Sequence, residues 1–343
     1  MNGTEEYCTY DANGLLLEQK DVVVDAAEGE KELTRYNYEY DSKGNISSIV
    51  GSETHEAIQG LGNLKNATFE YDAENRLIRY NDKDVIYDAD GNMTYGPVDG
   101  EMSELVYDCR NRLVSAGLVK YTYDVENNRI SAQSESYLEK YVVDTVSSPL
   151  SRVLEMTRYD MKDGRISGTG VDTYYIYGKG LIYEHVNDEF RLYHHYNHLG
   201  STTKLTDDDA EVIETYAYGT YGELLSGDTK YTRYLYNGRL GVSTDSNGLY
   251  YMRQGYYNPE IKRFINQDIV RGDIGNSQSL NRYSYVQGNP VNATDPFGLS
   301  PLSYLMAPSL PTKIPNLYLQ DHLMVLITHL QWKIKLSFLL CNC

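Results

Sequence analysis

Aromatic and aliphatic positions recur along the chain in short runs, and many of these runs end at a tyrosine that is followed by aspartate. Two or three residues later come glycine or asparagine, often arginine, and then an aliphatic residue. Seven copies of the unit are TYDANGLLLE from residue 9, EYDSKGNISSI from 39, EYDAENRLIRY from 70, IYDADGNMTY from 86, VYDCRNRLVSA from 106, TYDVENNRISA from 122 and RYDMKDGRISG from 158. Aspartate, glycine and asparagine accept the positive φ angles of hairpin turns. Each copy therefore predicts a strand that ends at its tyrosine, a tight turn, and a strand that opens on the aliphatic residue.

The repetition predicts the architecture. A single hairpin cannot bury its faces, so the copies must stack side by side into a continuous sheet. Helical periodicity of comparable length is absent from the sequence before residue 300. We expect an all-β chain of stacked hairpins that forms a β-solenoid or part of a wound β-shell. The alternative is that Tyr-Asp-x-x-Gly is merely frequent turn chemistry in a tyrosine-rich β protein, and the shared arginine and aliphatic positions argue against it.

Composition narrows the possible partners. The chain has 35 tyrosines against 5 phenylalanines and 1 tryptophan. This composition suits strands whose faces are only partly buried, because tyrosine packs through its ring and hydrogen-bonds through its hydroxyl. The formal charge of −18 opposes binding of the body to nucleic acid, which needs clustered lysine and arginine. The four cysteines lack metal-ligand spacing. The first residues lack the pattern of a signal peptide, so we expect a cytosolic chain or the end of a longer one.

The sequence resembles the RHS/YD-repeat family, which includes polymorphic toxins, the C-component of Tc toxins, cell-wall-associated proteins and teneurins. The repeats carry part of the resemblance, and the ordered motifs YHHYNHLGSTTKLTDDDAEVIETYAYGTYGELL, GLYYMRQGYYNPEIKRFINQD and LNRYSYVQGNPVNATDPFGL carry the more specific part. The resemblance implies a hollow β-shell closed by a C-terminal core, with a variable segment inside. It divides the chain into YD repeats (1–190), an RHS-associated core (191–299) and a variable tip (300–343).

Composition changes at the predicted boundary after residue 299. Only Lys313, Lys333, Lys335 and Asp321 carry charge after it, and four of the nine prolines fall there. The apolar run from His322 to Trp332 is too short to span a bilayer. The sequence of the tip contains no pair of nucleophile and base, no set of metal ligands and no phosphate-binding loop. Two interpretations of the tip therefore remain, a working effector and a remnant.

The end of the core contains candidate catalytic residues. In self-cleaving relatives, the equivalents of Asp268 in KRFINQD and Asp295 in ATDPFGL form an aspartate pair that cuts after the leucine, which here is the bond between Leu299 and Ser300. Two carboxylates at close range cannot both ionise, so one serves as acid and the other as base. The resemblance therefore implies a possible aspartyl autoprotease.

Several positions depart from the family pattern. Asp268 lacks the following Pro-x-Gly, and its interval to Asp295 is lengthened by RGDIGNSQS. Glycine replaces arginine at Gly255, where the family has the arginine that supports the aspartates, and Arg253 is a possible substitute because alternate strand residues share a face. The alternative for both aspartates is turn formation, since Asp-Pro holds the chain extended and Gly298 allows a sharp reversal.

Other candidate sites are weaker. His194, His195 and His198 fit a metal site by type, although the family motif already accounts for them, and Asp207–Asp209 fits a hairpin turn better than a calcium loop. We therefore predict no metal and no cofactor. The leading function is the closing end of a shell that holds or presents the tip within a secreted or cell-surface protein, in contact with upstream repeats or a partner shell protein. An immunity protein is a possible further partner by family analogy, and a carbohydrate-binding or adhesion module is a further alternative.

Overall fold

The computed structural model describes residues 4–25, 29–53, 67–187, 190–272, 277–299 and 302–303. The first sheet contains seven antiparallel strands in chain order, which are β1 (Thr4–Tyr10), β2 (Leu16–Asp25), β3 (Gly29–Tyr40), β4 (Ile46–Glu53), β5 (Ala67–Tyr71), β6 (Leu77–Tyr80) and β7 (Lys83–Asp84). Each strand pairs with its neighbours in sequence, as expected for a row of hairpins.

The second sheet contains thirteen antiparallel strands, also in chain order. They are β8 (Ile86–Tyr87), β9 (Met93–Val98), β10 (Glu101–Tyr107), β11 (Leu113–Ala116), β12 (Val119–Tyr123), β13 (Arg129–Gln133), β14 (Tyr137–Asp144), β15 (Arg152–Lys162), β16 (Arg165–Tyr177), β17 (Leu181–Val186), β18 (Phe190–Tyr196), β19 (Thr202–Thr206) and β20 (Val212–Thr215). The hydrogen-bonded order continues through residue 190, where the resemblance places the end of the repeats.

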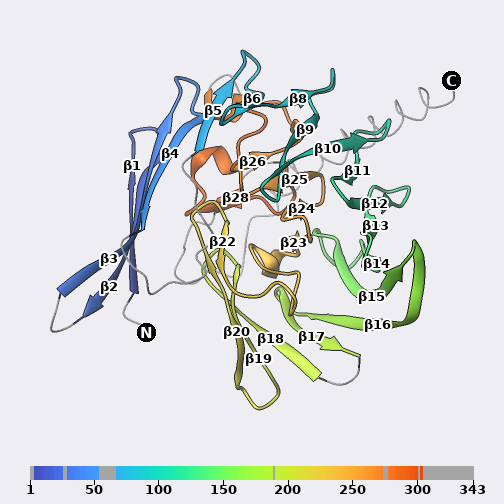
Figure 1. The fold of residues 1–343 in the computed structure, drawn as a ribbon. Helices are drawn as coiled ribbons and strands as arrows, with labels where there is room; N and C mark the ends of the chain where they lie inside the picture. The colour runs from blue at the N-terminus through green and yellow to red at the C-terminus, as the bar shows by residue number, and fades with distance from the viewer. Residues whose placement is uncertain are drawn as a thin grey trace.

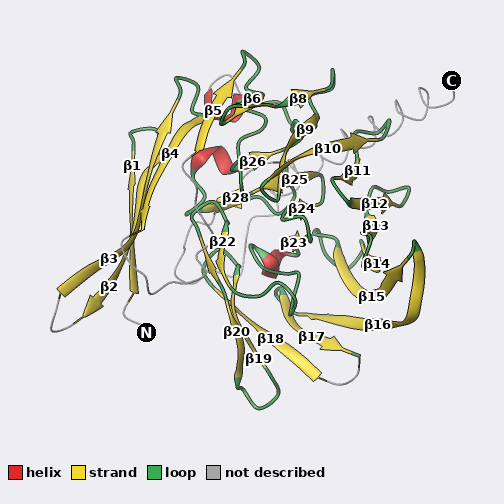
Figure 2. Cartoon of the chain, in the orientation of Figure 1, coloured by secondary structure: helices red, strands yellow, loops and turns green. Residues whose placement is uncertain are grey.

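The remaining elements are short. Two small sheets pair β21 (Ala217–Tyr218) with β22 (Leu224–Ser226) and β27 (Ala293–Thr294) with β28 (Leu302–Ser303), and a four-stranded sheet contains β23 (Ser243–Thr244), β24 (Tyr250–Met252), β25 (Gly255–Asn258) and β26 (Arg263–Phe264). Three 3-10 helices are η1 (Gly238–Leu240), η2 (Ser277–Leu280) and η3 (Val286–Gly288). Among the described residues no α-helix occurs, and Figure 2 shows strands and loops with short 3-10 helices in red. The prediction of an all-β chain is confirmed.

The repeat turns form because the aspartate side chain accepts hydrogen bonds from backbone N–H groups that have no backbone partner. In the copy at 122, Asp124 Oδ1 accepts the backbone N–H groups of Glu126 and Asn128 at 2.9 and 2.8 Å, and its Oδ2 accepts the Asn128 side chain at 2.9 Å. Asn127 has a φ of 74°, the left-handed region that asparagine and glycine tolerate best. The residues that recur among the copies of the unit are therefore those that close the turn.

In several copies the tyrosine of the unit joins one hairpin to an earlier one. The hydroxyl of Tyr123 donates to the carbonyl of Leu113 at 2.7 Å, and Leu113 opens the strand after the preceding turn. The same contact, from the strand-ending tyrosine to a residue at the start of an earlier strand, is made by Tyr40 to Leu16, Tyr71 to Ile46, Tyr177 to Val153, Tyr196 to Leu181 and Tyr218 to Thr202. A half-buried ring with a bonded hydroxyl explains why phenylalanine is rare here.

The copy at 158 is the exception, and the prediction for it was wrong. Tyr159 lies within β15 rather than at its end, and the strand continues to Lys162. The turn falls at Asp163 and Gly164, which have φ angles of 52° and 73°. Asp-Gly supplies both positive φ angles of a two-residue hairpin, so the turn residues lie two positions later than in the other copies.

Residues 230–272 and 277–299, which we call the inner module, lie between the two large sheets. Figure 1 shows β1–β5 as one wall and β8–β20 winding over the top and down the other side, with the orange inner module between them. One buried cluster joins Leu16 and Leu77 of the first sheet, Leu113 of the second, and Tyr250 and Tyr257 of the inner module. Burial of each such side chain contributes roughly 1.5–3 kcal/mol, so the inner module is part of the same core.

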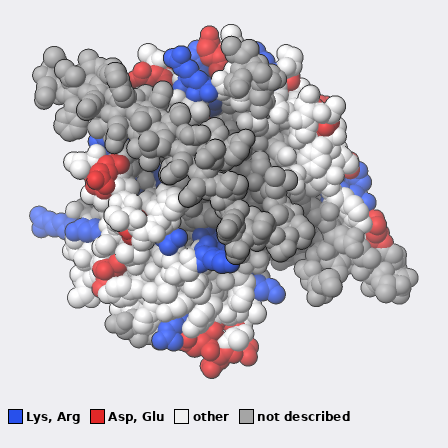
Figure 3. All heavy atoms as spheres, turned by 180° about the vertical axis from the view of Figure 1, so that it is seen from behind, with Lys and Arg blue, Asp and Glu red and all other residues white. Residues whose placement is uncertain are grey.

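Polar contacts tie the inner module to the strands and turns around it. Tyr283 Oη donates to the carbonyl of Gly91 at 2.9 Å, and Asn258 Nδ2 donates to that of Pro97 at 2.7 Å. Charged side chains stand mostly on the outside, and the rear view in Figure 3 shows acidic ones gathered at the lower end of that face.

Candidate functional site

Asp295 begins a tight turn at the end of the inner module. The backbone N–H of Gly298 donates to the Asp295 carbonyl at 3.2 Å, and the φ of Gly298 is +67°. Asp295 Oδ1 accepts the backbone N–H of Leu299 at 3.1 Å, and Asp295 and Leu299 are 3% and 4% exposed. A buried carboxylate thus lies four residues before Leu299, the first member of the predicted scissile bond, and the other member, Ser300, lies outside the described residues.

The backbone of Asp268 is bonded to Arg282. The Asp268 N–H donates to the Arg282 carbonyl at 2.9 Å, while Arg282 Nε donates to the Asp268 carbonyl at 2.7 Å. Burial raises the pKa of Asp268 to about 7, and the charge of Asp295 adds to this rise while Val270 N–H and Arg282 oppose it. The charge of Asp295 therefore acts on Asp268, the aspartate whose pKa is raised.

Arg253 reaches the turn that contains Asp295, but through the backbone. Its Nη1 donates to the Pro296 carbonyl at 2.5 Å, and its Nη2 donates to the carbonyls of Ser151 and Leu240, each at 2.8 Å. Burial lowers the pKa of Arg253 to about 10. The strand-alternation argument for Arg253 was wrong, because the residue lies in the turn between β24 and β25 with a φ of 60°.

Gly255 packs tightly where the family has arginine. A Cβ there would lie 2.9 Å from Phe264 Cδ1 and 3.5 Å from the Gly298 carbonyl. An arginine at this position would need Phe264 to move, so in this chain the Phe264 ring and the Gly298 carbonyl are packed against glycine.

The three histidines have separate partners. His194 Nε2 lies 3.0 Å from Glu184 Oε1, His195 Nε2 lies 3.0 Å from Thr206 Oγ1, and His198 Nε2 lies 3.0 Å from the Val291 carbonyl. No group of three or more metal-ligating side chains occurs in the described part of the chain.

The Asp207–Asp209 run forms a hairpin turn, as predicted. Asp207 Oδ1 accepts the N–H groups of Asp209 and Glu211 at 3.0 and 2.9 Å, the same pattern as in the repeat turns. Cys8 and Cys109 are free thiols, and the other two cysteines lie outside the described residues.

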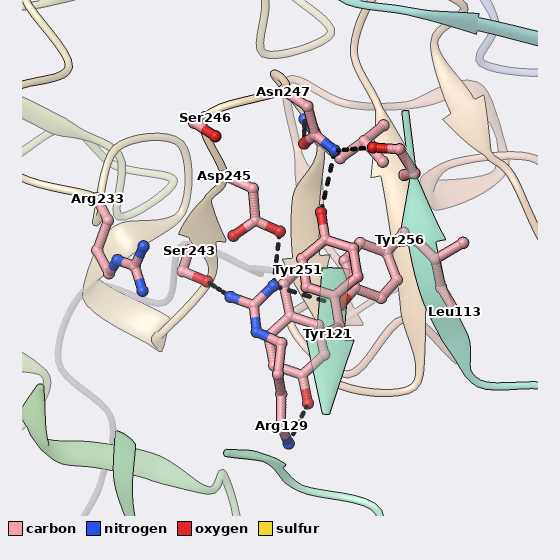
Figure 4. Close-up of polar contacts among 12 residues, drawn as sticks. Leu113, Tyr121, Arg129, Arg233, Ser243, Asp245, Ser246, Asn247, Tyr251 and Tyr256 are labelled. Carbon is pink, nitrogen blue, oxygen red and sulfur yellow. Dashed lines mark hydrogen bonds and ion pairs between the residues drawn. The ribbon is translucent and has the colours of Figure 1, made fainter. Parts of the chain in front are cut away.

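A buried arginine cluster links β13 to the inner module, and sequence reasoning missed it. Arg129 Nη1 contacts Asp245 Oδ2 at 2.6 Å, and Nη2 donates to Ser243 Oγ at 2.9 Å, with the two charged side chains 2% and 1% exposed (Figure 4). The guanidinium lies 4.1 Å from the ring centre of Tyr251 and 5.8 Å from that of Tyr256. The arginine position of the repeat was a visible signal, but only the fold shows which copy faces the inner module.

A second buried set lies next to it. Glu139 Oε1 contacts Arg158 Nη1 at 2.6 Å, and Glu139 Oε2 contacts Arg233 Nη2 at 2.5 Å and the Tyr141 hydroxyl at 2.7 Å. Although burial raises the pKa of Glu139, these partners outweigh it and hold the pKa below its usual value. Glu139 is therefore ionised, and Arg233 of the inner module is fixed against β14.

Sequence comparison finds relatives that match about a third of the chain. No family model matches the chain. It is 30% identical over 129 residues to the tRNA3(Ser)-specific nuclease WapA of Bacillus spizizenii, which covers 36% of this chain and 5% of WapA. It is 32% identical over 127 residues to the toxin subunit YenC2 of Yersinia entomophaga, which covers 35% of this chain and 12% of YenC2.

Among solved structures, TcdB2-TccC3 without its hypervariable C-terminal region shares the fold, with a TM-score of 0.66 and 19% identity over 86% of this chain and 15% of that one. The relatives support the toxin-related part of the predicted resemblance and do not point to teneurins in particular. The chain spans a small part of the relatives that it matches. In the described residues no helix is long and apolar enough to cross a membrane.

Proposed function

We propose that the chain is the C-terminal part of a YD-repeat shell that encloses or presents the segment after residue 299 in a toxin or surface-delivery protein. The observation that carries this proposal is the inner module, which is packed between two long hairpin sheets and fixed by buried ion pairs. A module held inside a curved sheet is suited to close a shell rather than to bind ligands on an outer surface.

The partners of this shell segment are further repeats of a longer parent chain or a separate shell protein. Within the described residues β1 and β20 pair on one side only, so each has a sheet edge available for another strand. On β20, Val212 and Ile213 are 54% and 36% exposed. We place the assembled protein outside the cell or at its surface, and an immunity protein as a further partner, by the resemblance alone.

Self-association tests the shell proposal. Size-exclusion chromatography with light scattering should show concentration-dependent assemblies of the chain, because open edges template strand pairing. Ile213→Lys should reduce them, since a lysine on an edge strand opposes pairing, whereas Val125→Lys, at an exposed repeat turn, serves as the matched control. A monodisperse wild-type monomer at all concentrations would contradict the proposal.

We propose self-cleavage after Leu299 as a second function of the same module. Asp295 accepts a proton from a water that attacks the Leu299 carbonyl, and protonated Asp268 donates a proton to the departing amine of Ser300. The C–N bond breaks, and a carboxyl at Leu299 and an amine at Ser300 result. The raised pKa of Asp268 supports this division of roles, because an acid must hold its proton near neutral pH. Arg253 acts as a positioning residue through Pro296.

Intact-mass spectrometry tests the cleavage. The wild-type chain should give a fragment that begins at Ser300, and Asp295→Asn and Asp268→Asn should each leave the chain whole. Asp163→Asn, at the tip of the β15–β16 hairpin, is the control and should cleave normally. A whole wild-type chain would reject the cleavage and leave the shell proposal standing. The tyrosines that would serve the adhesion alternative are largely buried in the core, so no observation favours it.

A further inference from the structure

Arg282, which lies between η2 and η3, is hydrogen-bonded to both backbone groups of Asp268. Its carbonyl accepts the Asp268 N–H at 2.9 Å, and its Nε donates to the Asp268 carbonyl at 2.7 Å. Its Nη2 donates to the same carbonyl oxygen, so two N–H groups of one guanidinium hold one acceptor. These bonds fix the backbone of Asp268 and place a positive charge next to the residue that serves as the acid in the cleavage step.

The Asp268 carboxyl lies between charges of opposite sign. Its Oδ1 accepts the Val270 N–H at 2.8 Å. Burial raises the pKa of Asp268 to about 7, and the charge of Asp295 acts in the same direction, whereas the charge of Arg282 opposes both. Arg282 is therefore a cation that favours the ionised form of this carboxyl.

The influence is mutual. Burial lowers the pKa of Arg282, and the charge of Arg271 acts in the same direction, whereas Asp268 and Tyr283 raise it. Each of the two side chains thus favours the charged form of the other.

The other arginines near Asp268 are directed elsewhere. Arg253 donates to the carbonyls of Pro296, Ser151 and Leu240, so it supports the turn rather than the acid. Arg110 donates to the Val125 carbonyl at 3.2 Å.

Water has access to this side of the inner module. A cavity of about 370 Å³ is lined by Arg282 and by Gln267 and Ile269, which flank Asp268 in the chain. Solvent in the cavity partly screens the charge of Arg282, so we expect its effect on Asp268 to be moderate.

We propose that Arg282 is a positioning residue for self-cleavage, which holds Asp268 in place and stabilises the carboxylate that forms when Asp268 gives its proton to the Ser300 amine. The inference rests on the self-cleavage proposed above. As the proton leaves, negative charge develops on Asp268, and a guanidinium that is already fixed beside it favours that charge. Without Arg282, Asp268 would hold its proton more tightly and would be a weaker acid.

The pH profile of cleavage tests this role. The full chain is purified in urea, refolded by dilution into buffers of different pH, and followed by intact mass. Arg282→Gln should lower the maximal rate about tenfold and should move the loss of activity at high pH to higher pH, because Asp268 ionises later without the cation. Arg282→Lys keeps the charge and should lose activity at the same pH as the wild type.

Arg110→Gln is the matched control, because it removes an arginine that lines the same cavity but bonds to Val125. Its rate and pH profile should equal those of the wild type. Tyrosine fluorescence should show that each variant refolds, and Arg282→Met, which keeps the aliphatic part of the side chain, replaces Arg282→Gln if that variant does not.

The outcomes separate this inference from self-cleavage itself. If the wild type cleaves and Arg282→Gln cleaves at the same rate with the same profile, the role of Arg282 is rejected and self-cleavage stands. Slower cleavage with an unshifted profile also rejects it, because Arg282 would then act on the fold and not on the acid. A wild-type chain that stays whole at every pH rejects both.

Discussion

The buried pair of Arg129 and Asp245 should be the strongest single link between the hairpin sheet and the inner module. Arg129→Met would leave the Asp245 carboxyl, 1% exposed at its side chain, without its 2.6 Å partner. Removing one member of such a pair costs about 3–5 kcal/mol, because the remaining charge is uncompensated. The stacked ring of Tyr251 adds about 1–2 kcal/mol, part of which the methionine retains.

Urea unfolding monitored by tyrosine fluorescence measures this loss as a fall in the transition midpoint at unchanged slope. A double-mutant cycle isolates the pair, since Arg129→Met with Asp245→Asn removes both charges together. We expect the double variant to be about 2–3 kcal/mol more stable than the sum of the single losses predicts. Additivity within about 0.5 kcal/mol, or a single loss under about 1 kcal/mol, would refute the reasoning.

Three further predictions concern the turn, the candidate acid and the repeat. Gly298→Ala should lower the free energy of unfolding in urea by about 1–3 kcal/mol, because the φ of Gly298 is +67° and a Cβ would lie 2.8 Å from the Met252 carbonyl. The control Gly14→Ala, where a Cβ would meet no atom within 4 Å, should cost only about 1 kcal/mol. Equal losses in the two variants would contradict this prediction. Since the folded pKa of Asp268 is raised to about 7 from an ordinary value near 4, the folded state keeps the extra proton between these values, and stability should fall by roughly 1–3 kcal/mol as pH rises from 4 to 7. The stability of Asp268→Asn should change less with pH between 4 and 7, and a pH dependence equal to that of the wild type would count against the raised pKa of Asp268. Tyr123→Phe should cost about 1–2 kcal/mol, because it leaves the Leu113 carbonyl without its 2.7 Å donor, and a neutral effect would show that the ring alone matters.

Much of the fold followed from the sequence because the repeat is local. Asp124 closes its turn with partners two and four residues away, so the hairpin is encoded within one copy. The copy at Tyr159 was predicted wrongly for the same reason, since the neighbouring Asp-Gly competes for the turn and the motif alone does not rank the two.

The site was only partly predictable because its contacts are long-range. Asp268 and Asp295 were found from motifs, but the bonds between Asp268 and Arg282 were indicated by no spacing rule. Arg253 was chosen by alternation, yet it reaches Pro296 because it lies in a turn. The partner of Arg129, at Asp245, is 116 residues away and became visible only when the inner module was placed against β13.

We propose that the inner module both closes the sheet and contributes the aspartate pair that cuts after Leu299. The most direct measurement is the intact mass of the purified chain held at pH 5–6, where Asp268 keeps its proton, beside Asp295→Asn and the control Asp163→Asn. We predict a fragment starting at Ser300 from the wild type and the control, and a whole chain from Asp295→Asn. A whole wild-type chain, or cleavage that persists in Asp295→Asn, would contradict the claim.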